Sequence, residues 1–379
     1  MRKHIAFIVE SAHGHVNPTL GIASELVKRG YRVSHAVKDS FAARVTASGA
    51  EAKIYRPLET KLDLFREMAK DRSGEFLFDF SRVDLNQFSK ESFQKESDNT
   101  LSQLEDIYEN DRPDLVIFDV MNPAGMALAS AWGISSIEHC PMMIEAGGAE
   151  HTAGMVIVSL PEFLQESRET LDERFHFIGP VFNEGAFFKP LSLAPYPGPT
   201  VLVSATTGLL PQVDFFLTAI HAFETLPWRI ILSVGEELDP AMLDPLPENF
   251  QINQFSSQPK ILEQSSLFIG QGGPASILEA LRCGVPPLLI PPSQVHDLYA
   301  RRVEKLKLGA RLPHKDFSAD TLRTAATSLM RNQLILDRVA ATQRQLQENL
   351  GAIHAADLVE QYMSREMCGH VSKHGKNVS

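Results

Sequence analysis

Two histidines stand close together near the start of the chain, in the stretch HGHVNP at residues 13–18. Histidine is the side chain whose ordinary pKa lies nearest neutrality, so an imidazole beside a cleft can take a proton from a hydroxyl group. The stretch comes two residues after the short apolar run HIAFIVE, which is typical of a buried strand. We therefore expect a histidine at the end of the first strand that can act as a base.

Such a base needs a second group that fixes which ring nitrogen carries the proton. Asp119 ends another apolar run, PDLVIFDV, and so occupies the equivalent place on a second strand. In open α/β sheets, ligands bind beyond the carboxyl ends of the strands. Asp119 is therefore the candidate partner of the histidine. The alternative is that these are ordinary capping or loop residues.

A glycine turn near the other end of the chain is a candidate anion site. The stretch GQGGPASILEALRCG at 270–284 runs from a strand end into a helix that has Pro274 in its first turn. The amides and the dipole of a helix start attract a phosphate. Ser276 adds a hydroxyl, and Glu279, three residues further on, projects from the same face and could accept hydrogen bonds from a ribose. The spacing predicts a nucleotide diphosphate site.

Alternating strand and helix patterns must position these residues. The pattern is clear from residue 4 to about 140, and it restarts at residue 200 after the Pro- and Gly-rich stretch NEGAFFKPLSLAPYPGPT. It closes with a long polar helix from about 317 to 363. We predict an α/β protein of two doubly wound, Rossmann-like domains. The predicted parts are a first domain at 1–185, a linker at 186–199, a second domain at 200–350, and a C-terminal segment at 351–379 that returns to the first domain.

Composition narrows the class of partner. The 379 residues carry a formal net charge of −11, with 36 Lys and Arg against 47 Asp and Glu, and this acidic balance argues against nucleic acid binding. The three cysteines are far apart and odd in number, which excludes a disulfide framework. No stretch approaches the ~18–20 apolar residues of a spanning helix. We expect a cytoplasmic protein without a membrane span.

Aromatic side chains interrupt the polar, helical stretch between residues 58 and 110. We expect this stretch to form helices and loops over the carboxyl edge of the first sheet. Phe76, Phe78 and Phe80 are then candidate acceptor contacts, with ordinary helix packing as the alternative. His35, His139 and His151 lack ligand spacing and are interpreted as plain strand or loop residues.

With these motifs in place, the chain resembles the family 1 inverting glycosyltransferases of the GT-B fold, in particular the bacterial macrolide or YjiC-like UDP-glycosyltransferase group. The matching stretches, in chain order, are AHGHVNPTLGIASELVKRGYRV, PDLVIFD, DERFHFIGP, WRIILSVG and QGGPASILEALRCGVP. The resemblance covers nearly the whole chain, most clearly about 1 to 315. It implies two Rossmann-like domains facing a central cleft.

The resemblance also implies roles for single residues. His15, in the H-x-N-P motif, matches the general base of the family, and Asp119 matches the aspartate paired with it. The implied donor contacts are Thr207 beneath the phosphates, Phe255 and Gln258 along the uracil, Gly273 and Ser276 at the diphosphate, and Glu279 at the ribose. Phe255 replaces the tryptophan that the family has at that position.

Three departures from the family pattern bear on function. Gln271-Gly272-Gly273 stands where the family has His-x-Gly, so a neutral amide replaces an imidazole that donates to the diphosphate. The acidic-Gln pair that holds the sugar hydroxyls falls on Val295-His296, or on His296-Asp297 if the match shifts by one residue. The segment between Cys140 and Val156 is several tens of residues shorter than in relatives. That shortening implies a more open site, a large acceptor or a partner that completes the wall.

The implied activity is transfer of a sugar from a UDP- or dTDP-sugar to a hydroxyl of a small natural product. The sequence has no D-x-D motif, so we expect a metal-independent enzyme with no cofactor beyond the nucleotide sugar. Val295 favours a deoxysugar or another unusual donor. Two alternatives stay open: a non-catalytic relative that supports a partner enzyme, and a sugar-independent reaction that uses His15 and Asp119. A partner protein or a homodimer is also a candidate assembly.

Overall fold

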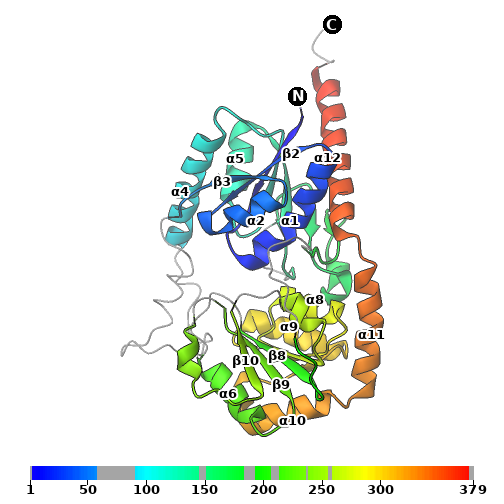
Figure 1. The fold of residues 1–379 in the computed structure, drawn as a ribbon. Coiled ribbons are helices and arrows are strands. Elements are labelled where there is room, and N and C mark those ends of the chain that lie inside the picture. Colours follow the sequence, from blue (N-terminus) through cyan, green and yellow to red (C-terminus); the bar gives the residue numbers. More distant parts are fainter. Residues whose placement is uncertain are drawn as a thin grey trace. The chain divides into compact units, whose positions relative to one another are not determined.

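The computed structural model describes residues 2–57, 90–144, 151–182, 193–205, 213–235, 238–254 and 258–374, and gives the backbone alone at 90–94 and 366–374. The chain divides into two compact units, each with its own parallel sheet (Figure 1). Unit 1 consists of Met1–Leu58, Asn86–Gly185 and Asn349–Ser379, and unit 2 consists of Glu59–Leu85 and Ala186–Glu348.

Unit 1 contains a seven-stranded sheet in the order β3-β2-β1-β4-β5-β6-β7. Every described pairing in it is parallel. Its strands are β1 (His4–Ile8), β2 (Arg32–Val37), β3 (Glu51–Ile54), β4 (Leu115–Asp119), β5 (Ser135–Cys140), β6 (Val156–Val158) and β7 (Phe175–Phe177). Its helices are α1 (His13–Lys28), α2 (Ala42–Ala47), α4 (Lys90–Tyr108), α5 (Ala124–Trp132) and α12 (Gly351–His374).

Helices cover both faces of this sheet, which explains why its central strands β1 and β4 are apolar along most of their length. Alternate residues of β1 and β4, such as Phe7 and Ile117, pack with buried residues of α1 and α12. The intervening residues, such as Ile8 and Phe118, pack with buried residues of α4 and α5. The last helix, α12, therefore lies against α1 (Figure 1).

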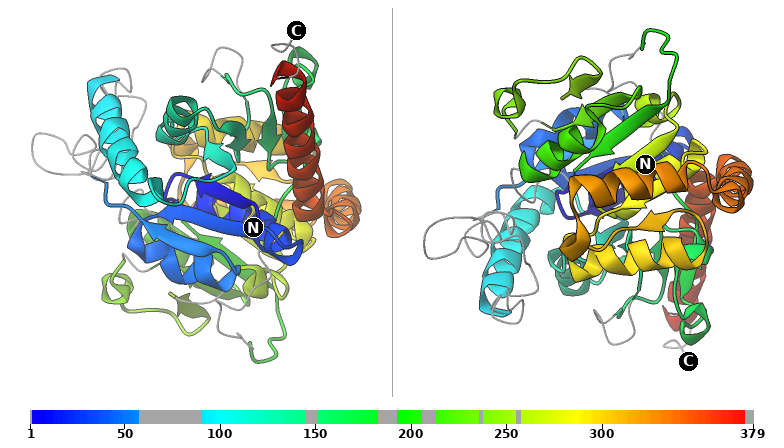
Figure 2. Two further views of the ribbon diagram at one scale, coloured as in Figure 1. Left: turned by 90° about the horizontal axis from the view of Figure 1, so that it is seen from above. Right: turned by 90° about the horizontal axis from the view of Figure 1, so that it is seen from below.

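Unit 2 contains a six-stranded parallel sheet in the order β10-β9-β8-β11-β12-β13. Its strands are β8 (Thr200–Ser204), β9 (Arg229–Ser233), β10 (Phe250–Asn253), β11 (Leu267–Gly270), β12 (Pro287–Leu289) and β13 (Ala310–Arg311). Its helices are α6 (Val213–Phe223), α7 (Gln258–Leu262), α8 (Pro274–Arg282), α9 (Gln294–Lys305), α10 (Ala319–Leu329) and α11 (Gln333–Gln347). Helix α10 packs against α6, and α11 packs against α8 (Figure 2).

Both strand orders reverse beside the first strand of their unit, as in doubly wound Rossmann-like sheets. The prediction of an α/β protein with two such sheets is confirmed. Within the described residues, no helix is long and apolar enough to cross a membrane.

Two predicted elements differ from the structure. The long polar helix expected from about 317 to 363 is wrong, because the chain forms α10, α11 and the start of α12 there. Asn332 breaks the run: its side chain accepts the Ile335 amide at 3.3 Å and so starts α11. The first strand ends at Ile8, and α1 already begins at His13, so HGHVNP forms the start of a helix and not the end of the strand.

Candidate functional site

The first group of predicted residues lies at the carboxyl edge of the unit 1 sheet. Asp119 is the last residue of β4, and β4 pairs with β1, which leads into α1. Because β1 and β4 are neighbours, the His15 side chain in the first turn of α1 lies beside the Asp119 carboxylate. The His15 Nδ1 atom lies 2.8 Å from Asp119 Oδ2 and 3.0 Å from Oδ1. The structure thus brings together two residues that are 104 positions apart in sequence.

The surroundings of Asp119 determine the tautomer of His15. A carboxylate only accepts hydrogen bonds, so His15 Nδ1 is protonated, and in the neutral ring Nε2 carries the lone pair. Asp119 is fully buried, and burial alone would raise the pKa of its carboxyl group. Attraction to His15 and the interaction with the His139 ring outweigh burial and hold the Asp119 pKa below its usual range. Asp119 is therefore an anion that can stabilise a protonated His15.

The neighbouring histidine, His13, lies in a different environment. Its side chain is exposed, and its Nδ1 accepts a hydrogen bond from Arg44 at 3.2 Å. The His13 ring also contacts Phe41 edge-on, with ring centroids 5.1 Å apart. Of the two histidines in HGHVNP, only His15 is paired with a buried carboxylate in the described structure.

His139 was interpreted from the sequence as a plain strand or loop residue, but the structure places it beside the His15–Asp119 pair. Its Nδ1 lies 3.8 Å from Asp119 Oδ2, and its Nε2 lies 2.7 Å from the Ser159 hydroxyl. His139 and Asp119 are register partners on adjacent strands. The signal was present in the sequence, because IEHC closes the strand pattern that follows PDLVIFDV.

The second group of predicted residues lies where β11 leads into α8 in unit 2. Gln271 is almost fully buried, and Gly272 has a φ of +94°, a conformation that favours glycine. A Cβ on Gly272 would also lie 2.9 Å from the carbonyl oxygen of His296. Gly273 caps α8, and a Cβ there would have no heavy atom within 4 Å. The turn therefore presents the amides of the α8 start beside an open approach.

Glu279 and Gln258 meet one turn further along. Gln258, at the start of α7, donates its side-chain amide to the Glu279 carboxylate at 2.6 Å. Burial raises the pKa of Glu279 to about 7, although the Gln258 bond and Arg282 oppose the shift. Ser276 lies one helical turn before Glu279 on the same side of α8. The four residues Gly273, Ser276, Glu279 and Gln258 thus line one side of the α8 start.

The start of α9 carries the residues predicted to face the sugar. Val295 is 50% exposed, whereas His296 Nδ1 lies 2.7 Å from the hydroxyl of Ser293, which caps the helix. Burial lowers the pKa of His296 to about 4, so its ring is neutral at neutral pH. Asp297 is paired with two arginines, Arg301 and Arg311, at 2.7 and 2.5 Å.

Several predicted residues lie outside the part of the chain that the structure describes. These are the donor-site candidates Thr207 and Phe255 and the acceptor-site candidates Phe76, Phe78 and Phe80. Among the described residues, no group of three or more His, Cys, Asp or Glu side chains is arranged to hold a metal ion.

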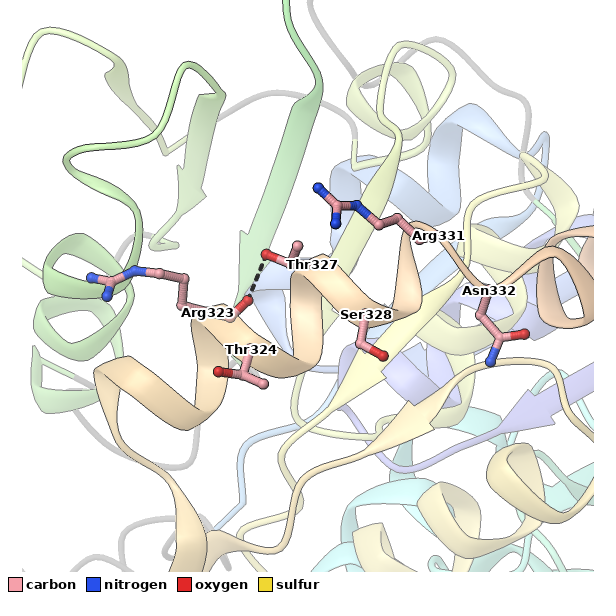
Figure 3. Close-up of a pocket in the computed structure, with 6 residues that line it drawn as sticks. All are labelled: Arg323, Thr324, Thr327, Ser328, Arg331 and Asn332. Carbon is pink, nitrogen blue, oxygen red and sulfur yellow. Dashed lines mark hydrogen bonds between the residues drawn. The ribbon is translucent and has the colours of Figure 1, made fainter.

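An open pocket in unit 2 is lined by none of the described candidate residues (Figure 3). The side chains that line it come from α10 and the turn after it: Arg323, Thr324, Thr327, Ser328, Arg331 and Asn332. The Thr327 hydroxyl donates to the Arg323 carbonyl at 2.8 Å, and the Arg323 guanidinium donates to the Ala222 carbonyl at 2.6 Å. The first bond lies within α10, and the second links α10 to α6.

Comparisons with known proteins match both units. A family model described as "Erythromycin biosynthesis protein CIII-like, C-terminal domain" matches residues 219–363. The chain is 34% identical over 399 residues to the NDP-glycosyltransferase YjiC of Bacillus licheniformis, covering 96% of this chain and 98% of that protein. It is 29% identical over 406 residues to the demethyllactenocin mycarosyltransferase of Streptomyces fradiae, covering 95% and 87%. Among solved structures, the glycotransferase of kitacinnamycin matches with a TM-score of 0.81 and 27% identity, covering 96% of this chain and 100% of that one.

Proposed function

The chain belongs to the YjiC-like group of family 1 glycosyltransferases with the GT-B fold, and on that premise we propose that it is an inverting enzyme with His15 as general base. The observation that carries the proposal is the 2.8 Å contact between His15 Nδ1 and the buried Asp119 carboxylate. The donor is a UDP- or dTDP-sugar. The acceptor is a hydroxyl of a small natural product, as the name of the Streptomyces fradiae relative suggests.

The base step uses the tautomer that Asp119 selects. His15 Nε2 takes the proton of the acceptor hydroxyl while the hydroxyl oxygen forms a bond to the anomeric carbon of the sugar. The bond from that carbon to the diphosphate oxygen breaks, and the diphosphate leaves with the electron pair. Because the hydroxyl attacks from the face opposite the diphosphate, the configuration inverts. His15 then carries a positive charge, which the Asp119 anion stabilises. Asp119 does not itself take the proton, because its pKa is held low.

The α8 start supplies what the departing diphosphate needs. The amides after Gly273 and the Ser276 hydroxyl donate hydrogen bonds, and the helix dipole favours the negative charge there. Gln271 contributes a neutral donor where relatives have an imidazole, and a charge-assisted bond is roughly twice as strong as a neutral one. We place the ribose on Glu279, with Gln258 fixing the carboxylate. In this scheme no metal ion is required.

The start of α9 supports an unusual sugar. Asp297 is already neutralised by Arg301 and Arg311, which leaves it poorly suited to accept bonds from sugar hydroxyls. We therefore favour the match in which Val295 and His296 face the sugar. The exposed Val295 side chain offers an apolar contact and no acceptor, which suits a donor that lacks a hydroxyl at that position. A deoxysugar donor follows.

Calorimetry with UDP and dTDP, followed by product analysis with the corresponding sugars, tests this proposal. We expect at least one of the nucleotides to bind, and we expect transfer to a panel of hydroxylated aromatic and macrolactone acceptors with inversion at the anomeric carbon. Absence of binding by both nucleotides would contradict the donor assignment. Conversion of an acceptor without any nucleotide sugar would instead favour a sugar-independent reaction.

A further inference from the structure

Three adjacent strands of unit 1 carry polar side chains at their carboxyl ends, and together these form a buried row. Asp119 ends β4, His139 is the penultimate residue of β5, and Ser159 directly follows β6. Their exposed fractions are 0, 0 and 4%. Because β4, β5 and β6 are neighbours in the sheet, the row runs from His15 at 2.8 Å through Asp119 to His139 and Ser159.

The chemistry of the row determines how the His139 ring is protonated. Its Nδ1 faces Asp119 Oδ2 at 3.8 Å, and a carboxylate can only accept. The ring is therefore oriented by electrostatics with Nδ1–H toward Asp119, and Nε2 accepts the Ser159 hydroxyl proton at 2.7 Å. Within the described residues, Nδ1 has no hydrogen-bond partner. A fully buried N–H with no partner is costly unless a nearby charge offsets that cost.

The other carboxylate oxygen, Oδ1, has a backbone partner in addition to His15. The Met121 amide donates to Asp119 Oδ1 at 2.7 Å, in the turn that follows β4. Oδ2 is therefore the oxygen that lies closer to both histidine rings. A third buried ring, His35, lies in the same core, where burial and the charge interaction with His139 lower the pKa of His35 to about 3, so that His35 is neutral. Its Nε2 is bonded to Thr19 at 3.0 Å.

We propose that His139, oriented by Ser159, is a positioning residue that keeps Asp119 Oδ2 directed at His15 Nδ1. This inference rests on the proposed role of His15 as the base. His139 exchanges no proton during the reaction. Its Nδ1–H stays directed at Asp119 Oδ2, and its dipole favours the carboxylate in the orientation that His15 needs.

The Ser159→Ala variant tests the proposal, because it removes the hydroxyl that orients His139 and leaves the ring itself in the core. Ser34→Ala is the matched control: Ser34 is fully buried and lies 2.7 Å from Nε2 of His4, the first residue of β1. Ser159→Thr keeps a hydroxyl and should restore the behaviour of the native protein.

We expect the pKa of His15, followed by NMR on histidine-labelled protein, to fall in Ser159→Ala by about 0.5–1 unit, a roughly three- to tenfold loss of proton affinity. The kcat should fall roughly tenfold, since a small misplacement of a catalytic group has effects of this size or larger. In Ser34→Ala the His15 pKa and the kcat should match those of the native protein. The unfolding temperature of Ser34→Ala should nevertheless be lowered about as much as that of Ser159→Ala.

An unchanged or raised His15 pKa in Ser159→Ala would overturn the proposal, as would an equal shift in Ser34→Ala. The NMR titration does not depend on turnover. If a His15→Gln variant kept native turnover, the proposed function would fail, whereas the titration would still decide whether His139 positions Asp119.

Discussion

The side-chain amide of Gln258 lies 2.6 Å from the carboxylate of Glu279 and links the start of α7 to the middle of α8. Because burial raises the Glu279 pKa to about 7, this carboxyl group changes its charge close to neutral pH. Glu279 also faces the proposed ribose site. Nucleotide binding and the free energy of unfolding should therefore both change with pH near neutrality.

Glu279→Gln should weaken the binding of UDP or dTDP by about tenfold, because hydrogen bonds to a charged acceptor contribute about 1.5–3 kcal/mol. In the native protein, affinity should rise as the pH increases from 6 to 8, since the carboxylate form is the better acceptor. Calorimetry at both pH values measures this. Glu263→Gln, which changes an exposed ion pair with Lys260, is the control and should bind like the native protein. Equal affinity in Glu279→Gln and native protein would contradict the ribose assignment.

The same titration should appear in the free energy of unfolding. In the folded protein Glu279 keeps its proton up to about pH 7, whereas its ordinary pKa is 4.5. The stability from this group is therefore fully present below about pH 4.5 and is lost as the pH rises through 7. Urea unfolding of native protein and Glu279→Gln should show the native protein losing about 1–3 kcal/mol relative to the variant between pH 4.5 and pH 8. A pH-independent difference would contradict the raised pKa.

The two glycines before α8 should separate stability from binding. Gly272→Ala places a Cβ 2.9 Å from the His296 carbonyl oxygen at a φ of +94°, so we expect a loss of about 1–3 kcal/mol in the free energy of unfolding. Gly273→Ala has open space around its Cβ and should unfold like the native protein. If diphosphate approaches this turn, Gly273→Ala should nonetheless bind nucleotide more weakly. Native affinity in that variant would exclude a diphosphate contact at Gly273.

The start of α9 should determine which sugar is used. Val295→Asp supplies an acceptor for a sugar hydroxyl at a position that is half exposed, so the fold should tolerate it. We expect the ratio of kcat/KM for a fully hydroxylated hexose donor to that for a deoxyhexose donor to rise by about tenfold. Asp297→Asn is the comparison: loss of its pairs with Arg301 and Arg311 should lower stability, while the donor ratio stays unchanged. A shift of the ratio in Asp297→Asn alone would favour the other match to the family motif.

Much of the fold was predictable because the central strands β1, β4, β8 and β11 are short, mostly apolar and followed by helix patterns. The start of α1 was not, since Gly14 and Pro18 are poor helix formers and the residue before the helix, Ala12, has no capping side chain. Tertiary packing of Val16 and Leu20 against the sheet overrides that local preference. The breaks between the last three helices depend on single capping residues such as Asn332, which periodicity does not detect.

The candidate site also has a part that the sequence predicts and a part that it does not. His15 and Asp119 were predictable from motifs, and their contact depends on β1 and β4 being neighbours, which a strand pattern alone does not reveal. His139 was missed because ligand spacing along the sequence was the criterion. Its relevance comes from register: β5 pairs with β4 so that His139 lies opposite Asp119.

Turnover of His15→Gln and His13→Gln, measured with the nucleotide sugar that the native protein uses, tests the central claim most directly. The two histidines share one motif, but His15 is bonded to buried Asp119, whereas the exposed His13 is bonded to half-buried Arg44. We predict that His15→Gln loses about a thousandfold or more in kcat, in keeping with loss of a general base, while its nucleotide affinity stays native. His13→Gln should stay within about threefold of native kcat, since the His13 side chain is exposed and its described contacts are with Arg44 and Phe41. More than a tenth of native kcat in His15→Gln, or an equal loss in His13→Gln, would contradict the assignment of His15 as the base.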